Sequence, residues 1–316
     1  MRAWDGDSRG KETKMKSSMV VGTKQASMFV ATALCLAACG GASGVDAQDE
    51  LGAEPFADVA AAERVGEQTS ELKNGTLLDG TGASRGAVLL EIYWPQRGNR
   101  PGYWKRCSGQ IVSNRTILTA AHCVNDFASG DSTWVIASRP TAAGWVDVIP
   151  GSWTMVRWNP ASTTMNPITP YDVGLLISPT PLVGYTSADA AALAKSTPSN
   201  ITMSVHGFGY YSDTQRDWNG RSASIQPSYQ QSAYYWSSVG ANTPAICTGD
   251  SGGPLKGHYN GFFMTFGVTS WGTPGPGAHC RADANWAPTA HNIPWLKSNI
   301  VGSAGCFETA TMMTCF

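Results

Sequence analysis

Short segments rich in β-branched and aromatic residues, separated by clusters of glycine, proline, asparagine and serine, dominate the chain from Leu72 onward. Such segments are typical of β-strands joined by turns, and their close spacing is typical of sandwiches and barrels. Because a later group repeats the pattern, we expect two barrels in series. The clearest segments are residues 87–93, 110–112, 116–120, 133–137, 173–177, 201–205 and 261–271.

Two segments have a helical pattern, residues 188–195 and residues 293–301, and Pro294 suits the first turn of the second one. The composition, 42% apolar and only 14% charged residues, argues against disorder and against long charged helices. A formal net charge of -1 gives no sign of a nucleic-acid partner. We therefore expect a loop-rich all-β globule that is monomeric and binds no nucleic acid.

The amino-terminal part resembles an export signal. Lysines precede an apolar run at residues 26–38, and its 13 residues are too few to span a hydrocarbon layer of ~30 Å as a helix. We therefore predict a signal peptide over residues 1–39. Acidic side chains among residues 1–13 are unusual at the start of a signal, so translation from Met15 or Met19 stays an alternative.

Small residues stand immediately before Cys39. This arrangement resembles the lipobox of bacterial lipoproteins, and the resemblance implies that Cys39 is acylated and tethers the chain to a membrane. An ordinary cleaved signal that contains a cysteine is the alternative. Either reading predicts export, as a cell-envelope lipoprotein or as a secreted extracellular protein.

Residues 40–71 hold alanine, glycine and eight acidic residues against a single arginine, Arg64. A segment with so few aromatic and β-branched residues suits a linker or a pro-segment. The folded body is then expected over residues 72–303, followed by a tail at residues 304–316.

Six cysteines follow Cys39, and six allow 15 pairings in an oxidising compartment. The short tail between Cys306 and Cys315 is best closed by a disulfide. No two cysteines form a C-x-x-C motif, and no two histidines stand four residues apart, so we predict no metal site and no cofactor.

Ser251 stands among three glycines in the stretch of residues 247–254. Glycines allow a tight turn that exposes the hydroxyl and directs neighbouring N–H groups toward one point. A serine nucleophile also needs a base and a group that orients the base. His122, beside Cys123, is the candidate base, and Asp172, at the start of an apolar strand, is the candidate orienting group.

These motifs resemble those of the chymotrypsin family of serine proteases. Residues 119–123 are similar to the family's histidine motif, residues 172–176 to its aspartate motif and residues 249–254 to its serine motif, in the family's order. The similarity covers roughly residues 72–301. It implies two six-stranded antiparallel β-barrels with a C-terminal helix, and a catalytic triad in the cleft between the barrels.

The resemblance also implies roles. Ser251 would attack the scissile carbonyl, His122 would take and return the proton, and Asp172 would orient the imidazole. The backbone N–H groups of Gly249 and Ser251 would form the oxyanion hole. The chain is thereby identified as a secreted serine endopeptidase that cleaves protein or peptide substrates through an acyl-enzyme intermediate.

The family pattern implies two further disulfides, and it implies the substrate contacts. The disulfides are Cys107–Cys123 and Cys247–Cys280. The segment Ser270, Trp271 and Gly272 would flank the substrate backbone. Ala245 would lie at the base of the pocket for the residue before the scissile bond, the P1 residue, with Ile246 and Gly272 lining it. Without an acid at the base, this pocket is expected to prefer apolar residues; Asp283, if it points inward, is the alternative source of a basic preference.

The activation motif departs from the family. Many members begin their mature chain with Ile-Val-Gly-Gly, whose ammonium pairs with the acid before the nucleophile, here Asp250. Residues 72–75 read Leu-Lys-Asn-Gly instead. A cut before Leu72 is the predicted activation, and a constitutive enzyme without this switch is the alternative.

Two other function classes share features with this sequence. Residues 249–253 also match the Gly-x-Ser-x-Gly elbow of α/β-hydrolases, which would make the chain an esterase, but that fold needs its histidine after the serine and a different strand pattern. A catalytically silent binding protein with the same barrels is the second class. Such relatives normally lose a triad residue, and here none is missing.

Overall fold

The computed structural model describes residues 72, 75–96, 101–162, 170–212, 214–230, 234–238, 244–275 and 279–316. They belong to one unit, Arg64–Phe316. The predicted signal peptide, Cys39 and the acidic segment up to residue 71 lie outside the described residues. Within the described ranges, no helix has both the length and the apolar character needed to cross a membrane.

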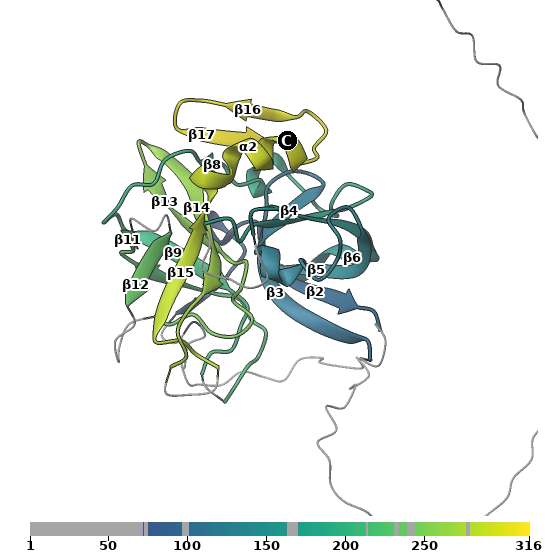
Figure 1. The fold of residues 1–316 in the computed structure, drawn as a ribbon, viewed down its shortest axis with the longest axis horizontal. Coiled ribbons are helices and arrows are strands. Elements are labelled where there is room, and N and C mark those ends of the chain that lie inside the picture. The colour runs from purple at the N-terminus through teal and green to yellow at the C-terminus, as the bar shows by residue number, and fades with distance from the viewer. Residues whose placement is uncertain are drawn as a thin grey trace, which may run out of the picture. The chain divides into compact units, whose positions relative to one another are not determined.

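Six antiparallel strands close into the first barrel, in the order β2-β3-β4-β7-β6-β5 (Figure 1). Burial alternates along the second half of β2: Leu90 and Ile92 are fully buried, while Glu91 and Tyr93 are partly exposed. One face of the strand therefore packs against the barrel core. The strands are β2 (Ala87–Trp94), β3 (Tyr103–Ile111), β4 (Thr116–Thr119), β5 (Ser132–Thr141), β6 (Gly144–Trp158) and β7 (Gly174–Ile177).

The second half of the body is a sheet with the path β1-β10-β9-β13-β14-β15-β12-β11, which does not close on itself among the described strands. Its core holds Tyr235, Phe266 and Trp286, all fully buried. The all-β, chymotrypsin-like double-barrel prediction is confirmed. The strands are β1 (Thr76–Leu77), β9 (Met203–Gly207), β10 (Arg221–Ile225), β11 (Ser228–Tyr229), β12 (Tyr235–Ser238), β13 (Pro254–Tyr259), β14 (Phe262–Trp271) and β15 (Asp283–Pro288).

The chain ends in helix α2 (Thr289–Asn299) and the hairpin of β16 (Cys306–Glu308) and β17 (Met312–Cys315), which Figure 1 shows together at one end of the body. The disulfide Cys306–Cys315 closes the hairpin. β17 pairs with β8 (Leu193–Ala194), a strand of the connection between the barrels. The C-terminal tail therefore packs onto the domain as an additional hairpin. The predicted C-terminal helix is present but begins earlier, at Thr289.

The helix predicted over residues 188–195 is wrong. The segment forms one short 3-10 turn, η3 (Ser187–Asp189), and then the strand β8. Thr186 and Asp189 cap the turn reciprocally, and the Asp189 carboxylate is bound by Arg139 of the first barrel. Leu193 pairs with strands on either side. Tertiary contacts thus outweigh the helix propensity of an alanine-rich segment.

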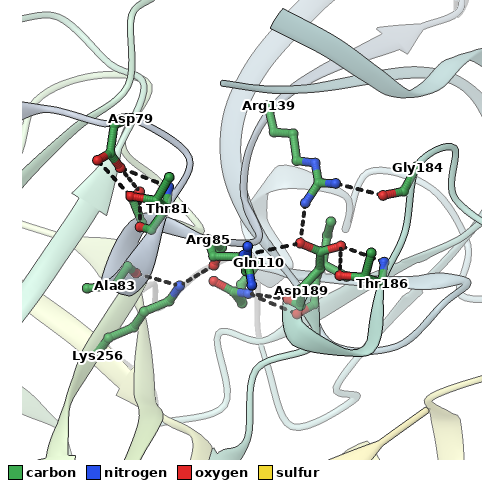
Figure 2. Close-up of polar contacts among 12 residues, drawn as sticks. Asp79, Thr81, Ala83, Arg85, Gln110, Arg139, Gly184, Thr186, Asp189 and Lys256 are labelled. Atoms are coloured by element: carbon green, nitrogen blue, oxygen red, sulfur yellow. Dashed lines mark hydrogen bonds and ion pairs between the residues drawn. The ribbon is translucent and has the colours of Figure 1, made fainter. Parts of the chain in front are cut away.

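A polar network ties the barrels to the segment that enters β2 (Figure 2). The Lys256 ammonium, on β13 and almost fully buried, donates to the carbonyl oxygens of Ala83 (3.1 Å) and Arg85 (2.9 Å). Gln110 of the first barrel reaches the backbone of Asp189. These hydrogen bonds therefore hold together the segment that enters β2, the first barrel and the connection between the barrels.

Lys256 gives this network a pH dependence. Burial lowers the pKa of Lys256 from 10.5 to about 7. Below about pH 7 the lysine is protonated in the folded and the unfolded chain, and the cost of burying its charge is fully present. Between about pH 7 and about pH 10.5 the unfolded chain binds more protons, so the free energy of unfolding rises with pH, by at most ~1.4 kcal/mol per pH unit.

We therefore expect the free energy of unfolding of Lys256→Met to lack the increase between about pH 7 and about pH 10.5 that Lys256 causes in the wild type. Urea unfolding of the wild type and the variant between about pH 7 and about pH 10 measures it. Lys297→Met is the matched control, because Lys297 is half exposed on α2. Parallel stability curves for the wild type and Lys256→Met would contradict the assignment.

Candidate active site

His122 and Asp172 are held together by two hydrogen bonds. His122 lies in the 3-10 turn η2 (Ala121–Cys123) directly after β4, and Asp172 lies directly before β7, the strand that pairs with β4. The ring Nδ1 of His122 is 2.8 Å from Asp172 Oδ2, and its backbone N–H donates to Asp172 Oδ1 at 2.9 Å. The pairing of two barrel strands therefore sets the orientation of the imidazole.

Asp172 is buried and receives a further hydrogen bond from Ser270, whose Oγ lies 2.6 Å from Oδ2. The register of β14 against β15 shifts between Thr269 and Trp271, so Ser270 lies at a bulge. Burial raises the pKa of Asp172, but the charge of His122 and the hydrogen bonds from His122 and Ser270 outweigh it and leave the pKa below the ordinary value. The carboxylate is ionised at neutral pH.

The Ser251 turn is fixed against the first barrel. Ser108 of β3 donates its backbone N–H to the Ser251 carbonyl oxygen at 2.8 Å. Gly252 has φ +83°, and a Cβ there would lie 2.1 Å from the Thr119 hydroxyl, so only glycine fits. The turn that carries Ser251 is thus packed against the end of β4, three residues before His122.

Gly249 adopts φ +102°, which glycine tolerates, and its carbonyl oxygen accepts a hydrogen bond from the Ser108 hydroxyl at 2.9 Å. Among the hydrogen bonds of the described residues, the N–H groups of Gly249 and Ser251 have no protein acceptor. Two neighbouring unpaired N–H groups beside a serine can stabilise a developing oxyanion.

Asp250 is fully buried behind this turn. Its carboxylate accepts hydrogen bonds from the backbone N–H groups of Gly209 (2.9 Å) and Cys247 (2.7 Å). Burial raises the pKa of Asp250 to about 7, although both hydrogen bonds and the charge of Arg221 act in the opposite direction. Leu72 is also buried, in the core of the second sheet.

The residues expected to bind substrate surround the disulfide Cys247–Cys280. Ala245 and Ile246 are buried, and the Ile246 carbonyl oxygen accepts a hydrogen bond from the backbone of Arg281 at 3.0 Å. Trp271 ends β14, and Gly272 follows it. The carboxylate of Asp283 accepts the backbone N–H of Thr273 at 2.7 Å. These segments therefore run side by side near the serine turn.

Some contacts at the site have no local signal in the sequence. The Ser108 hydroxyl joins Gly249 of one half to β3 of the other and also accepts the N–H of Phe208 at 3.0 Å. Lys105 donates to the His122 carbonyl oxygen at 2.5 Å. All these bonds span long sequence separations, and a serine or lysine in a strand does not by itself indicate them. In the described ranges, no three His, Cys, Asp or Glu side chains gather where they could hold a metal ion.

A barrel fold with a carboxylate-bound histidine, and a serine turn that is hydrogen-bonded to the same barrel, fits the class of chymotrypsin-like serine hydrolases. The family model described as Trypsin matches residues 95–290 of the chain. The chain is 25% identical to chymotrypsin-like elastase family member 1 of Homo sapiens over 270 residues, which are 75% of this chain and 98% of the relative.

It is also 27% identical to trypsin beta of Drosophila erecta over 246 residues, 73% of this chain and 89% of the relative. Trypsin, alkaline B, of Manduca sexta is 27% identical over 231 residues, 63% of this chain and 84% of that protein. The chain therefore belongs to the trypsin family and is a serine endopeptidase that acts on protein or peptide substrates. The three disulfides among the described residues fit an exported protein.

Proposed function

We propose that the chain hydrolyses peptide bonds through His122, Asp172 and Ser251. The observation that carries this proposal is the double hydrogen bond between His122 and Asp172, beside a serine turn that Ser108 fixes to the same barrel. With Nδ1 bonded to the carboxylate, Nε2 is the ring nitrogen left to act as the base.

In the proposed mechanism Ser251 Oγ attacks the scissile carbonyl carbon and its proton passes to His122. The carbonyl oxygen becomes an oxyanion, which the N–H groups of Gly249 and Ser251 stabilise. The C–N bond then breaks, His122 gives the proton to the leaving amine, and an acyl-enzyme remains. A water molecule, deprotonated by His122, repeats the attack and releases the acid and free Ser251.

Ser251→Ala, His122→Ala and Asp172→Asn should each lower kcat/KM by about 10⁴-fold or more, because the three side chains act as one unit. Kinetics on a peptide substrate measure the loss, and circular dichroism checks that each variant folds. A fluorophosphonate should label Ser251 in the wild type but not in Ser251→Ala. An active, folded Ser251→Ala protein would contradict the mechanism, and an unlabelled wild type after processing would favour a silent binding protein.

We propose that a cut before Leu72 activates the enzyme. Leu72 is buried in the second sheet although its φ is +41°, a left-handed conformation that is unfavourable for a leucine. The cut removes the peptide carbonyl group that precedes Leu72, and the steric restriction on the Leu72 backbone is removed with it. The strand β1 that follows pairs with β10 at Arg221, next to β9 and the Gly209 loop. An ammonium group on Leu72 would supply the positive partner that the buried Asp250 carboxylate lacks within the described residues.

Asp250→Asn should therefore leave the processed protein at least about 100-fold less active, because a buried ammonium without its partner is costly. Asp147→Asn, which changes an exposed carboxylate on β6, is the matched control and should keep the wild-type activity. Amino-terminal sequencing of the active wild type should begin at Leu72. Active enzyme whose first residue precedes Gly40 would rule the switch out and favour the constitutive alternative.

We also propose that the chain is exported and that Cys39 is acylated, which would tether the uncut protein to a membrane. This rests on the apolar run and the small residues before Cys39. Several acyl chains at about 0.8 kcal/mol per buried CH₂ would hold it firmly. Mass spectrometry of the uncut protein should find a lipid on Cys39; an unmodified mature chain that starts elsewhere would refute the tether.

The P1 pocket is proposed to prefer apolar residues. Ala245 offers no carboxylate at the base, and the Asp283 carboxylate already accepts the Thr273 N–H. A buried lysine or arginine would lack a counter-charge there, which is costly.

Cleavage of a peptide library should thus show cuts after apolar residues, in the wild type and in Asp283→Ala alike. The P1 residue is read by mass spectrometry of the products. Dominant cleavage after lysine or arginine, lost in Asp283→Ala, would show instead that Asp283 sets the preference.

A further inference from the structure

The loop after β9, residues 208–220, carries a stack of aromatic and guanidinium groups. The Cζ atom of Arg216 lies 4.5 Å from the ring centroid of Trp218 and 5.4 Å from that of Tyr210. Arg106, on β3 of the first barrel, lies over the same Trp218 ring at 4.2 Å. Two arginines from opposite halves of the protein therefore share one indole ring, a favourable cation–π arrangement.

This stack is next to the nucleophile. Tyr210 donates its backbone N–H to Thr248, three residues before Ser251, at 2.9 Å. The Tyr210 ring lies parallel to the His279 ring, with centroids 3.8 Å apart. Arg106 directly precedes Cys107, which is bonded to Cys123 beside His122. The stack is thus joined by single contacts to segments that lie one to three residues from Ser251 and His122 in the sequence.

The arginines in and beside the stack differ in their ion pairs. Arg106 forms an ion pair with Glu91 at 2.7 Å, and Arg221 forms one with Asp217 at 3.2 Å. Arg216 is exposed and has no ion pair within the described part of the chain. The aromatic rings cover faces of its guanidinium, while the N–H groups at the edge of the plane stay available to an oxyanion.

The stack and the expected P1 pocket are built from different elements. By resemblance, the segment from Ser270 to Gly272 flanks the substrate backbone and Gly272 lines the P1 pocket, which receives the acyl part of the substrate; Ser270 contacts Asp172. The stack is built from other elements, β3 and the loop after β9, which meet at Ser108 and Phe208. This separation from the P1 pocket points to the leaving-group side of the substrate.

We propose that Arg216, supported by Trp218 and Tyr210, binds an acidic side chain of the substrate on the leaving-group side, at one of the positions P1′ to P3′. This inference rests on the proposed function. The planar guanidinium matches a carboxylate in a two-point hydrogen bond, and stacking fixes its orientation before the substrate arrives. The enzyme thus combines an apolar residue before the scissile bond with an acidic residue after it.

The test uses peptides that share one apolar P1 residue and carry Asp, Asn or Lys at P1′, P2′ or P3′. The processed wild type should cleave the Asp peptide about fivefold faster in kcat/KM than the Asn peptide at one of these positions, as expected for a partly exposed ion pair. The preference should shrink in about 0.5 M salt. Arg216→Gln should abolish the ratio, and Arg216→Glu should reverse it in favour of Lys.

Lys297→Gln, the same charge change on α2, is the matched control and should keep the wild-type ratio. Fluorophosphonate titration of active enzyme separates this inference from the mechanism. Equal cleavage of Asp and Asn peptides by fully titrated wild type overturns the inference alone. An Asp preference that persists in Arg216→Glu also overturns it. Failure of the wild type to react with the fluorophosphonate overturns the proposed function, and this inference with it.

Discussion

The hydrogen bond from the Ser108 N–H to the Ser251 carbonyl oxygen is the link on which the site depends, because it joins the two halves that carry the chemistry. His122 and Asp172 are placed entirely by the first barrel, through the pairing of β4 with β7. Ser251 belongs to the second half. Neither half alone holds both the proposed base and the proposed nucleophile, so the site also depends on the packing of Gly252 against Thr119.

Much of the fold and the site could be predicted from the sequence because the signals are local. Glycines around Ser251 and an apolar strand after Asp172 are visible within a few residues. The helix predicted over residues 188–195 is absent from the structure, and it shows where prediction from local sequence fails. Its alanines favour a helix, but Arg139 and the strand partners of Leu193 lie far away in the chain. Contacts of this kind, including Ser270 with Asp172, depend on tertiary packing and leave no periodic pattern.

The two buried aspartates of the site, Asp172 and Asp250, have pKa values shifted in opposite directions. Asp172 has a histidine and a hydroxyl as partners, so its pKa lies below the ordinary value. Among the described residues, Asp250 accepts hydrogen bonds from two backbone N–H groups and is stabilised by the charge of Arg221, yet burial raises its pKa to about 7. The two buried aspartates therefore differ because the hydrogen bonds and charge around Asp172 outweigh its burial, whereas those around Asp250 do not. This difference is what the proposed activation, in which an ammonium group pairs with Asp250, would remove.

The loop that follows β9 connects Asp250 to the proposed substrate contact at Arg216. Its Gly209 N–H binds Asp250, its Tyr210 N–H binds Thr248, and Arg216 and Trp218 lie further along it. If an ammonium group pairs with Asp250 as proposed, the same hydrogen bonds would connect that pairing to the loop. The residues that bind the Ser251 turn and the residues of the proposed substrate contact thus belong to one loop. In a protein with this connectivity, substrate binding and activation are expected to stabilise the same loop conformation and thus to favour each other.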